Sequence, residues 1–188
     1  MQTPELQQVI INIFRKHGSI VYGEECSVLS HSVQSGLIAR DRGFDEELIL
    51  GAFLHDIGHL CPLEQEEGDF ERMGEYGIDA HDKLGGDYLK SRGFSDRIIA
   101  VVKNHVPSKR YLCLKDQTYY DQLSEASKQT LEYQGGMMSE EEAAEFEADP
   151  FFEDSIQIRQ VDEAAKEQNF EVQEKHWAYF QELLKKVL

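Results

Sequence analysis

The chain has 188 residues, of which 40% are hydrophobic, and a formal net charge of −17 at pH 7. This length and hydrophobic content are sufficient for one well-buried domain. The acidic charge argues against a nucleic-acid partner, because binding to phosphate backbones needs a basic face. No apolar run approaches the roughly 18 residues of a membrane span, and the first residues do not resemble a secretory signal. The three cysteines indicate no disulfide framework, so we expect a cytoplasmic protein with reduced thiols.

Helical periodicity dominates the chain. The apolar spacing predicts helices near residues 3–16, 26–41, 45–58, 78–91, 95–105, 121–133, 139–147, 152–167 and 172–187. Ser95 and Ser139 are expected N-caps, and Glu142 would complete a capping box with Ser139. We find no alternating strand pattern, internal repeat or linker. The sequence therefore predicts an all-α helical bundle in which residues 1–188 form a single domain.

The charge is unevenly distributed along the chain. Residues 64–71 and 139–149 are strongly acidic and are expected to be solvated faces, whereas residues 103–115 carry four basic side chains and no acid. A local basic segment in an acidic protein suits a small anion better than a polymer.

The stretch LILGAFLHDIGHL, residues 48–60, places His55, Asp56 and His59 directly after a run of apolar residues. Burying an unpaired carboxylate there would cost several kcal/mol, so a compensating charge is required. A divalent metal ion would supply it, because neutral imidazole and carboxylate are usual ligands for iron, manganese and zinc.

A longer pattern surrounds this pair. His31 lies 24 residues before it on another predicted helix, and Asp162 lies far downstream on an inward-facing stripe, with Asp154 and Glu163 as competing acids. Together, His31, the His55–Asp56 pair and Asp162 resemble the H…HD…D pattern of the HD-domain superfamily of metal-dependent helical enzymes, most of which are phosphohydrolases. His81 and His105 are the two further histidines that a second metal needs, with Asp56 bridging the pair.

The chain is more closely similar to the PhnZ-type HD-domain oxygenases, relatives of myo-inositol oxygenase that cleave the C–P bond of 1-hydroxylated phosphonates. The resemblance implies a dinuclear site in the core with two iron ions, Fe(II)/Fe(III). One iron would be held by His31, His55, Asp56 and Asp162, and the other by Asp56, His81 and His105.

The resemblance also implies the phosphonate contacts His59, Lys109, Ser127, Thr130 and Arg159. These residue types are suitable, because a phosphonate has three acceptor oxygens and binds cations, imidazole and hydroxyl groups. His59 is one helical turn after His55, Lys109 is expected in a loop after His105, and Ser127 and Thr130 share one helical face. Arg159 and Asp162 also share a face, which suggests a pocket for an anion.

The substrate's amine end is where the sequence departs from the family. The segment GEECSVLSH assigns the amine-binding carboxylate to Glu24, with Glu25 as a competitor. The family's iron-capping tyrosine then aligns with Val21, and Tyr22 is one place away. A carboxylate and an aromatic ring would serve either a primary ammonium or a trimethylammonium group. We favour the trimethylated form slightly, because Tyr22 would be available as an aromatic wall.

The resemblance implies O2-dependent cleavage of 1-hydroxy-2-(trimethylammonio)ethylphosphonate or 2-amino-1-hydroxyethylphosphonate. Phosphate would be released with glycine betaine or glycine, and the only partners would be the organophosphonate and O2. A metal-dependent phosphohydrolase of a phosphomonoester or nucleotide would need the same metals and anion contacts, and a non-catalytic signalling module is a third reading. The sequence leaves the N-methylation preference, the stereochemistry at C1 and the oligomeric state open.

Overall fold

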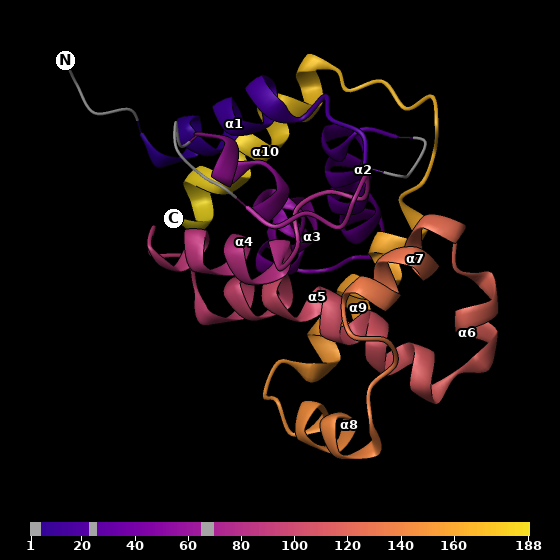
Figure 1. Ribbon diagram of the computed structural model, residues 1–188. Coiled ribbons are helices and arrows are strands. Elements are labelled where there is room, and N and C mark those ends of the chain that lie inside the picture. The colour runs from indigo at the N-terminus through magenta and orange to yellow at the C-terminus, as the bar shows by residue number, and fades with distance from the viewer. Residues whose placement is uncertain (1–4, 23–25, 65–69) are drawn as a thin grey trace.

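Figure 1 shows the computed structural model, which describes residues 5–22, 26–64 and 70–188. Its helices are α1 (Leu6–His17), α2 (Val28–Asp41), α3 (Glu46–Leu54), η1 (Ile57–His59), η2 (Cys61–Glu64), α4 (His81–Lys90), α5 (Asp96–Lys115), α6 (Gln117–Gln122), α7 (Glu125–Tyr133), α8 (Glu140–Glu147), α9 (Phe152–Ala164) and α10 (Glu174–Val187). Across the described residues, an isolated bridge between Arg72 and Ile78 is the only β-type pairing. The predicted all-α fold is therefore confirmed. No described helix combines the length and apolar character needed to cross a membrane.

The main core lies between α1, α2, α3, α5 and α10. Its centre is a column of three buried rings, in which Phe53 lies between Phe14 and Phe180 with ring centroids 4.6 Å and 4.1 Å away. Gly36 allows this column to pack closely, because a Cβ atom at that position would lie 2.5 Å from the Phe180 ring. Figure 1 shows α6, α7 and α8 at the end of the molecule opposite α1 and α10.

The predicted helix over residues 45–58 is wrong at its carboxyl end. The α-helix stops at Leu54, His55 caps it, and the chain continues as the short helix η1. The cause is a contact with another element: α4 begins directly against Gly58, where a Cβ atom would lie 1.8 Å from the His81 carbonyl oxygen. Local periodicity does not contain this contact.

The helix predicted over residues 95–105 is longer than expected, because α5 continues through Pro107 to Lys115. A proline inside a helix removes one hydrogen bond and costs about 3 kcal/mol. Packing of α5 against α3, α4, α6 and α9 outweighs that cost. Lys109 consequently lies on a helix and not in a loop.

The caps follow the sequence more closely. The side chains of Ser95 and Ser139 accept hydrogen bonds from backbone N–H groups of their helices, and Glu142 completes the capping box, as predicted. The helix predicted over residues 121–133 is divided, because Ser124 caps a new helix, α7.

Candidate metal centre and anion pocket

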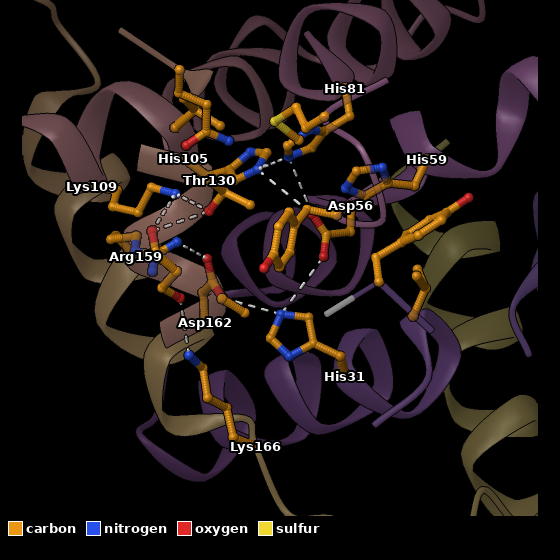
Figure 2. A pocket seen from close by; sticks show the side chains of 18 of the residues that line it. His31, Asp56, His59, His81, His105, Lys109, Thr130, Arg159, Asp162 and Lys166 are labelled. Carbon is orange, nitrogen blue, oxygen red and sulfur yellow. Dashed lines mark hydrogen bonds and ion pairs between the residues drawn. The ribbon is translucent and has the colours of Figure 1, made fainter. Parts of the chain in front are cut away.

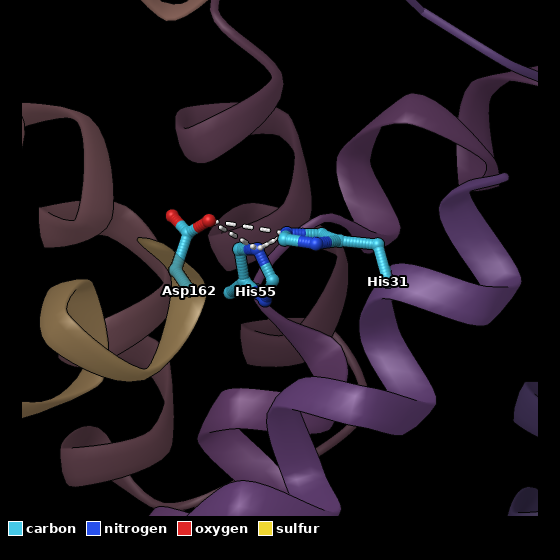
Figure 3. A group of neighbouring side chains, drawn as sticks. All are labelled: His31, His55 and Asp162. Atoms are coloured by element: carbon cyan, nitrogen blue, oxygen red, sulfur yellow. Dashed lines mark hydrogen bonds and ion pairs between the residues drawn. The ribbon is translucent and has the colours of Figure 1, made fainter. Parts of the chain in front are cut away.

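Six side chains from separate segments meet between α2, α3, α4, α5 and α9. They form two groups in which the ligand atoms lie within 4.8 Å of one another: His31, His55 and Asp162, and Asp56, His81 and His105. Figure 3 shows the first group, with His31 on α2 and Asp162 on α9 facing His55. Asp162 Oδ1 lies 3.1 Å from His31 Nε2.

Asp56 connects the two groups through its two carboxylate oxygens. Its Oδ2 atom lies 3.3 Å from His55 Nε2 and 3.7 Å from His31 Nε2. Its Oδ1 atom lies 3.7 Å from His81 Nε2 and 3.6 Å from His105 Nε2. A carboxylate with one oxygen in each group is the arrangement that a bridging ligand requires.

The four histidines of these groups present the same nitrogen to the centre. Each donates its Nδ1–H to a backbone carbonyl, at 2.6–3.1 Å: His31 to Ala165, His55 to Ala52, His81 to Ile78 and His105 to Val102. A carbonyl only accepts hydrogen bonds, so Nδ1 carries the proton and the Nε2 lone pair is directed inward. Such outer hydrogen bonds are usual for metal-binding histidines.

These inward lone pairs need a cation between them. The Nε2 atoms of His31 and His55 are 3.1 Å apart, and those of His81 and His105 are 3.0 Å apart. Two lone pairs this close, in a buried site, repel each other unless a proton or a metal ion lies between them. The donor set of imidazole nitrogens and carboxylate oxygens therefore fits one divalent metal ion in each group.

The electrostatics of the groups differ. Burial and the neighbouring His81 lower the pKa of His105 to about 3, so His105 is neutral and available as a ligand. Burial acts against the charge of Asp56, yet the surrounding imidazoles hold the pKa of this carboxyl well below its usual range. Burial also acts against a proton on His31, but the hydrogen bond and charge of Asp162 raise its pKa well above the usual value. A metal in the first group must therefore displace a proton.

The second group depends on a tight turn before α4. A Cβ atom at Gly58 would collide with the His81 carbonyl, so this position requires glycine. Ala80 directly precedes His81 and has a φ of 53°, in the left-handed region that costs non-glycine residues about 1–2 kcal/mol. Packing around the turn stabilises this conformation, and His81 thereby faces His105.

The structure distinguishes the three candidate acids on α9. Asp154 pairs with Arg97, at 2.6 Å, away from the histidines. Glu163 pairs with Arg159 and Lys166. Only Asp162 of the three reaches His31, as its helical stripe predicts.

A cavity of about 110 Å³ opens beside the two groups, and Figure 2 shows side chains pointing into it from several helices. Five predicted substrate contacts line it: His59, Lys109, Ser127, Thr130 and Arg159. Tyr22 also lines it. Glu24 and its competitor Glu25 lie outside the described residues.

Lys109 is the cation of the 103–115 segment that faces this cavity. Its side chain is 3% exposed, and its Nζ donates to Thr130 Oγ1 at 2.8 Å. Burial, followed by the charge of Arg159, lowers the pKa of Lys109 to about 7. The other three basic residues of this segment form ion pairs elsewhere: Lys103 with Asp87, Arg110 with Glu142 and Lys115 with Glu140. The charge of residues 103–115 suggested one site for a small anion. In the structure, only Lys109 of its four basic residues faces the cavity.

Arg159 is buried and already engaged. Its Nη1 donates to Asp162 Oδ2 at 2.5 Å, its Nε donates to the Tyr119 hydroxyl at 2.7 Å, and Glu163 pairs with its other amino group. Arg159 therefore holds the outer oxygen of Asp162 while the inner oxygen faces His31. It can orient Asp162 and also present positive charge to the cavity.

His59 differs from the four other histidines of the site. Its Nδ1 accepts a hydrogen bond from the Ile78 N–H at 3.2 Å, so the ring proton is on Nε2. The ring stacks on His81 with centroids 3.9 Å apart, and the Tyr22 ring lies 4.9 Å away on another side. An imidazole with this proton position donates a hydrogen bond, which suits an anion and not a metal ion.

Sequence reasoning missed several lining residues: Cys26, Met73, Tyr76, Gln134 and Lys166. Lys166 had a detectable signal, because it follows Asp162 by four residues, and the helix predicted over residues 152–167 would place the two on one face. Tyr76 and Met73 had none, since they belong to the non-helical segment before α4.

Residues 28–175 match the family model described as "HD domain". The chain belongs to the HD-domain family. The matched region contains all six residues of the two His/Asp groups.

Three relatives cover most of this chain. The uncharacterised protein L432 of Acanthamoeba polyphaga mimivirus is 42% identical over 84% of this chain and 71% of its own length. The [1-hydroxy-2-(trimethylamino)ethyl]phosphonate dioxygenase (glycine-betaine-forming) of Leisingera caerulea is 38% identical over 92% of this chain and 85% of its own. The hydroxymethylphosphonate dioxygenase of Gimesia maris is 33% identical over 87% of this chain and 79% of its own. The names of the two dioxygenases, together with the family match, confirm the resemblance to the HD-domain phosphonate oxygenases.

Proposed function

We propose that this HD-domain protein is a mixed-valent diiron oxygenase that cleaves the C–P bond of a small 1-hydroxyphosphonate with O2 and releases phosphate. The observation that carries the proposal is Asp56, whose two oxygens face two separate histidine groups beside a cavity lined by cations and hydroxyl groups. The phosphonate dioxygenase relatives, at 33–38% identity, support the reaction class.

His31, His55, Asp56 and Asp162 would hold one iron, and Asp56, His81 and His105 the other. When bound, the two irons would supply the activation of O2 and a Lewis acid for the substrate oxygens. The protein's own groups do the positioning. Carbonyl bonds to Nδ1 direct each ligand's Nε2 towards the metal groups, and Arg159 orients Asp162.

The phosphonate would bind in the cavity between Lys109 and His59. Lys109 donates to the Thr130 hydroxyl, and His59 offers an Nε2–H. These groups fix one end of the substrate, so that its hydroxylated carbon lies over the metal groups. Lys109→Ala or Arg159→Ala should therefore lower kcat/KM at least tenfold, because each removes a charge-assisted contact worth about 1.5–3 kcal/mol.

For the substrate we propose an amine-bearing phosphonate, with a slight preference for 1-hydroxy-2-(trimethylammonio)ethylphosphonate, which would yield glycine betaine. The reasons are Tyr22 beside His59 and the Leisingera relative. The Gimesia relative is named for a phosphonate without an amine, so three substrates need comparison. Competition among the trimethylated, the primary-amine and the hydroxymethyl phosphonates would rank them.

The deciding experiment is product analysis under O2 with iron-loaded protein. We expect phosphate and a carboxylic acid to appear together with O2 uptake, and neither to appear under nitrogen. Phosphate release without O2, from a phosphomonoester or nucleotide, would instead identify a phosphohydrolase and contradict the proposal.

We also propose that the HD domain includes the whole chain. Helices α1 and α10 lie largely outside the matched region, yet Phe14 and Phe180 stack on Phe53 of α3 in one core.

A further inference from the structure

The irregular segment after α9, residues 165–173, runs past α2 on its way to α10 (Figure 1). Gln34 of α2 holds this segment by both polar atoms of its side-chain amide. Its Oε1 accepts the Glu167 N–H at 2.9 Å, and its Nε2 donates to the Glu167 carbonyl oxygen at 3.0 Å. A single side chain therefore binds both backbone groups of one distant residue.

Gln34 is buried, with an exposed fraction of 5%, and the orientation of its amide is fixed. The Nε2 group also donates to the Ser30 hydroxyl at 3.0 Å. Exchanging the amide oxygen and nitrogen would place two donors together at the Glu167 N–H and two acceptors together at its carbonyl. Only a side chain with both a donor and an acceptor at this distance can make the contact.

The same segment supplies the carbonyl that orients a candidate metal ligand. Ala165, two residues before Glu167, accepts the Nδ1–H of His31 at 2.9 Å. His31 and Gln34 are three residues apart on α2 and so share one face of the helix. The two side chains therefore contact backbone groups two residues apart on one segment.

Ala165 is also joined to Asp162. The Ala165 N–H donates to the Asp162 carbonyl oxygen at 3.1 Å, where α9 ends. His31 and Asp162 both belong to the first His/Asp group. Ala165 thus lies between the two helices that carry these ligands, and Gln34 fixes the segment directly after it.

The other three candidate histidine ligands have local support. Their carbonyl partners lie three residues before them: Ala52 for His55, Ile78 for His81 and Val102 for His105. The neighbouring backbone sets such a contact. Among these four histidines, only His31 depends on a carbonyl from a distant segment, 134 residues along the chain.

We propose that Gln34 is a positioning residue for the metal ion of the first group. By holding Glu167, it places the Ala165 carbonyl against His31 and so keeps the Nε2 atom of His31 directed at the metal. The assignment rests on the metal-binding part of the proposed function and not on its reaction. Outer hydrogen-bond partners of metal-binding histidines typically change metal affinity by about 10–100-fold.

The test is equilibrium dialysis of the protein against Fe(II) under nitrogen, without substrate, in two backgrounds. His105→Ala removes a ligand of the second group, so the iron that remains reports on the first group, and His31→Ala does the reverse. Gln34→Met keeps the length of the side chain but has no N–H donor and no oxygen acceptor. We expect it to weaken Fe(II) binding about tenfold in the His105→Ala background and to change it less than about twofold in the His31→Ala background.

Val33→Ala is the matched control, because Val33 is the buried neighbour of Gln34 on α2 and packs in the main core. It should lower the stability of the fold but keep Fe(II) affinity within about twofold in both backgrounds. Gln34→Glu is the second variant, in case Gln34→Met does not fold. It keeps an acceptor for the Glu167 N–H but has no N–H for the Glu167 carbonyl, so it should weaken the first group about threefold or more.

Unchanged Fe(II) affinity of the first group in a folded Gln34 variant would overturn the assignment. An equal loss in both backgrounds, or a loss in Val33→Ala as large as in Gln34→Met, would also overturn it, since either would show a general structural role. The dialysis uses neither phosphonate nor O2. If Gln34→Met loses iron from the first group but no protein consumes O2 with a phosphonate, the positioning role stands and the proposed reaction fails.

Discussion

Replacing Lys109 by methionine should stabilise the fold and damage substrate binding at the same time. Methionine has nearly the same length as lysine but no charge, so it fits the buried position. Lys109 is 3% exposed, and burial together with Arg159 lowers its pKa from 10.5 to about 7. The folded protein therefore holds the proton less tightly than the unfolded chain does.

The difference in pKa between the folded and unfolded states gives the sign and size of the change in stability. Because the unfolded chain binds the proton more tightly, the contribution of Lys109 to the free energy of unfolding is least favourable below pH 7 and becomes more favourable as the pH increases towards 10.5. Each unit of pKa difference is worth about 1.4 kcal/mol, so at pH 7 the charge destabilises the fold by about 4 kcal/mol. Losing the hydrogen bond to Thr130 costs about 1 kcal/mol. The variant should gain about 3 kcal/mol at pH 7 and almost nothing at pH 10.

The assay is urea unfolding of the metal-free wild type and Lys109→Met at several values between pH 7 and pH 10. Lys128→Met serves as the control, because this lysine is partly exposed and pairs with Glu125 on the surface. Comparing each variant with the wild type at the same pH cancels the contributions of the other groups that titrate in this range. A Lys109→Met variant that is no more stable than the wild type at pH 7, or whose stability advantage does not shrink towards pH 10, would refute the reasoning.

Three further predictions concern the metal groups and the amine end. His81→Ala or His105→Ala should keep the helical circular dichroism spectrum of the wild type. Each variant should bind about one iron per chain in place of two and lose turnover. A wild type that binds a single zinc or manganese ion would contradict this prediction. Gly58→Ala should cost about 1–3 kcal/mol of stability, because its Cβ would collide with the His81 carbonyl, and metal analysis should show the second group losing more metal than the first. Glu24→Gln should weaken amine-bearing phosphonates much more than hydroxymethylphosphonate, and an equal, small effect on both would identify Glu24 as a surface acid.

Much of the fold was predictable because its determinants are local. Helical periodicity located most of the helices, and the capping box of Ser139 and Glu142 forms between residues three apart. The types of site residue were predictable for a related reason: histidine and aspartate after an apolar run imply a compensating cation, whatever the surrounding fold. The short pattern around His55 and Asp56 therefore indicated a metal centre before any geometry was known.

What the tertiary structure decided depends on contacts between distant segments. Helix α3 ends at Leu54 because α4 packs on Gly58, and α5 continues through Pro107 because other helices pack along it. Which ring nitrogen of a histidine carries the proton likewise depends on distant segments. His31 presents Nε2 because a carbonyl 134 residues away accepts its Nδ1–H, whereas His59 presents an N–H because a backbone amide occupies its Nδ1. Residue types alone show that an imidazole is available; only the backbone group opposite its other nitrogen decides whether it can bind a metal or an anion.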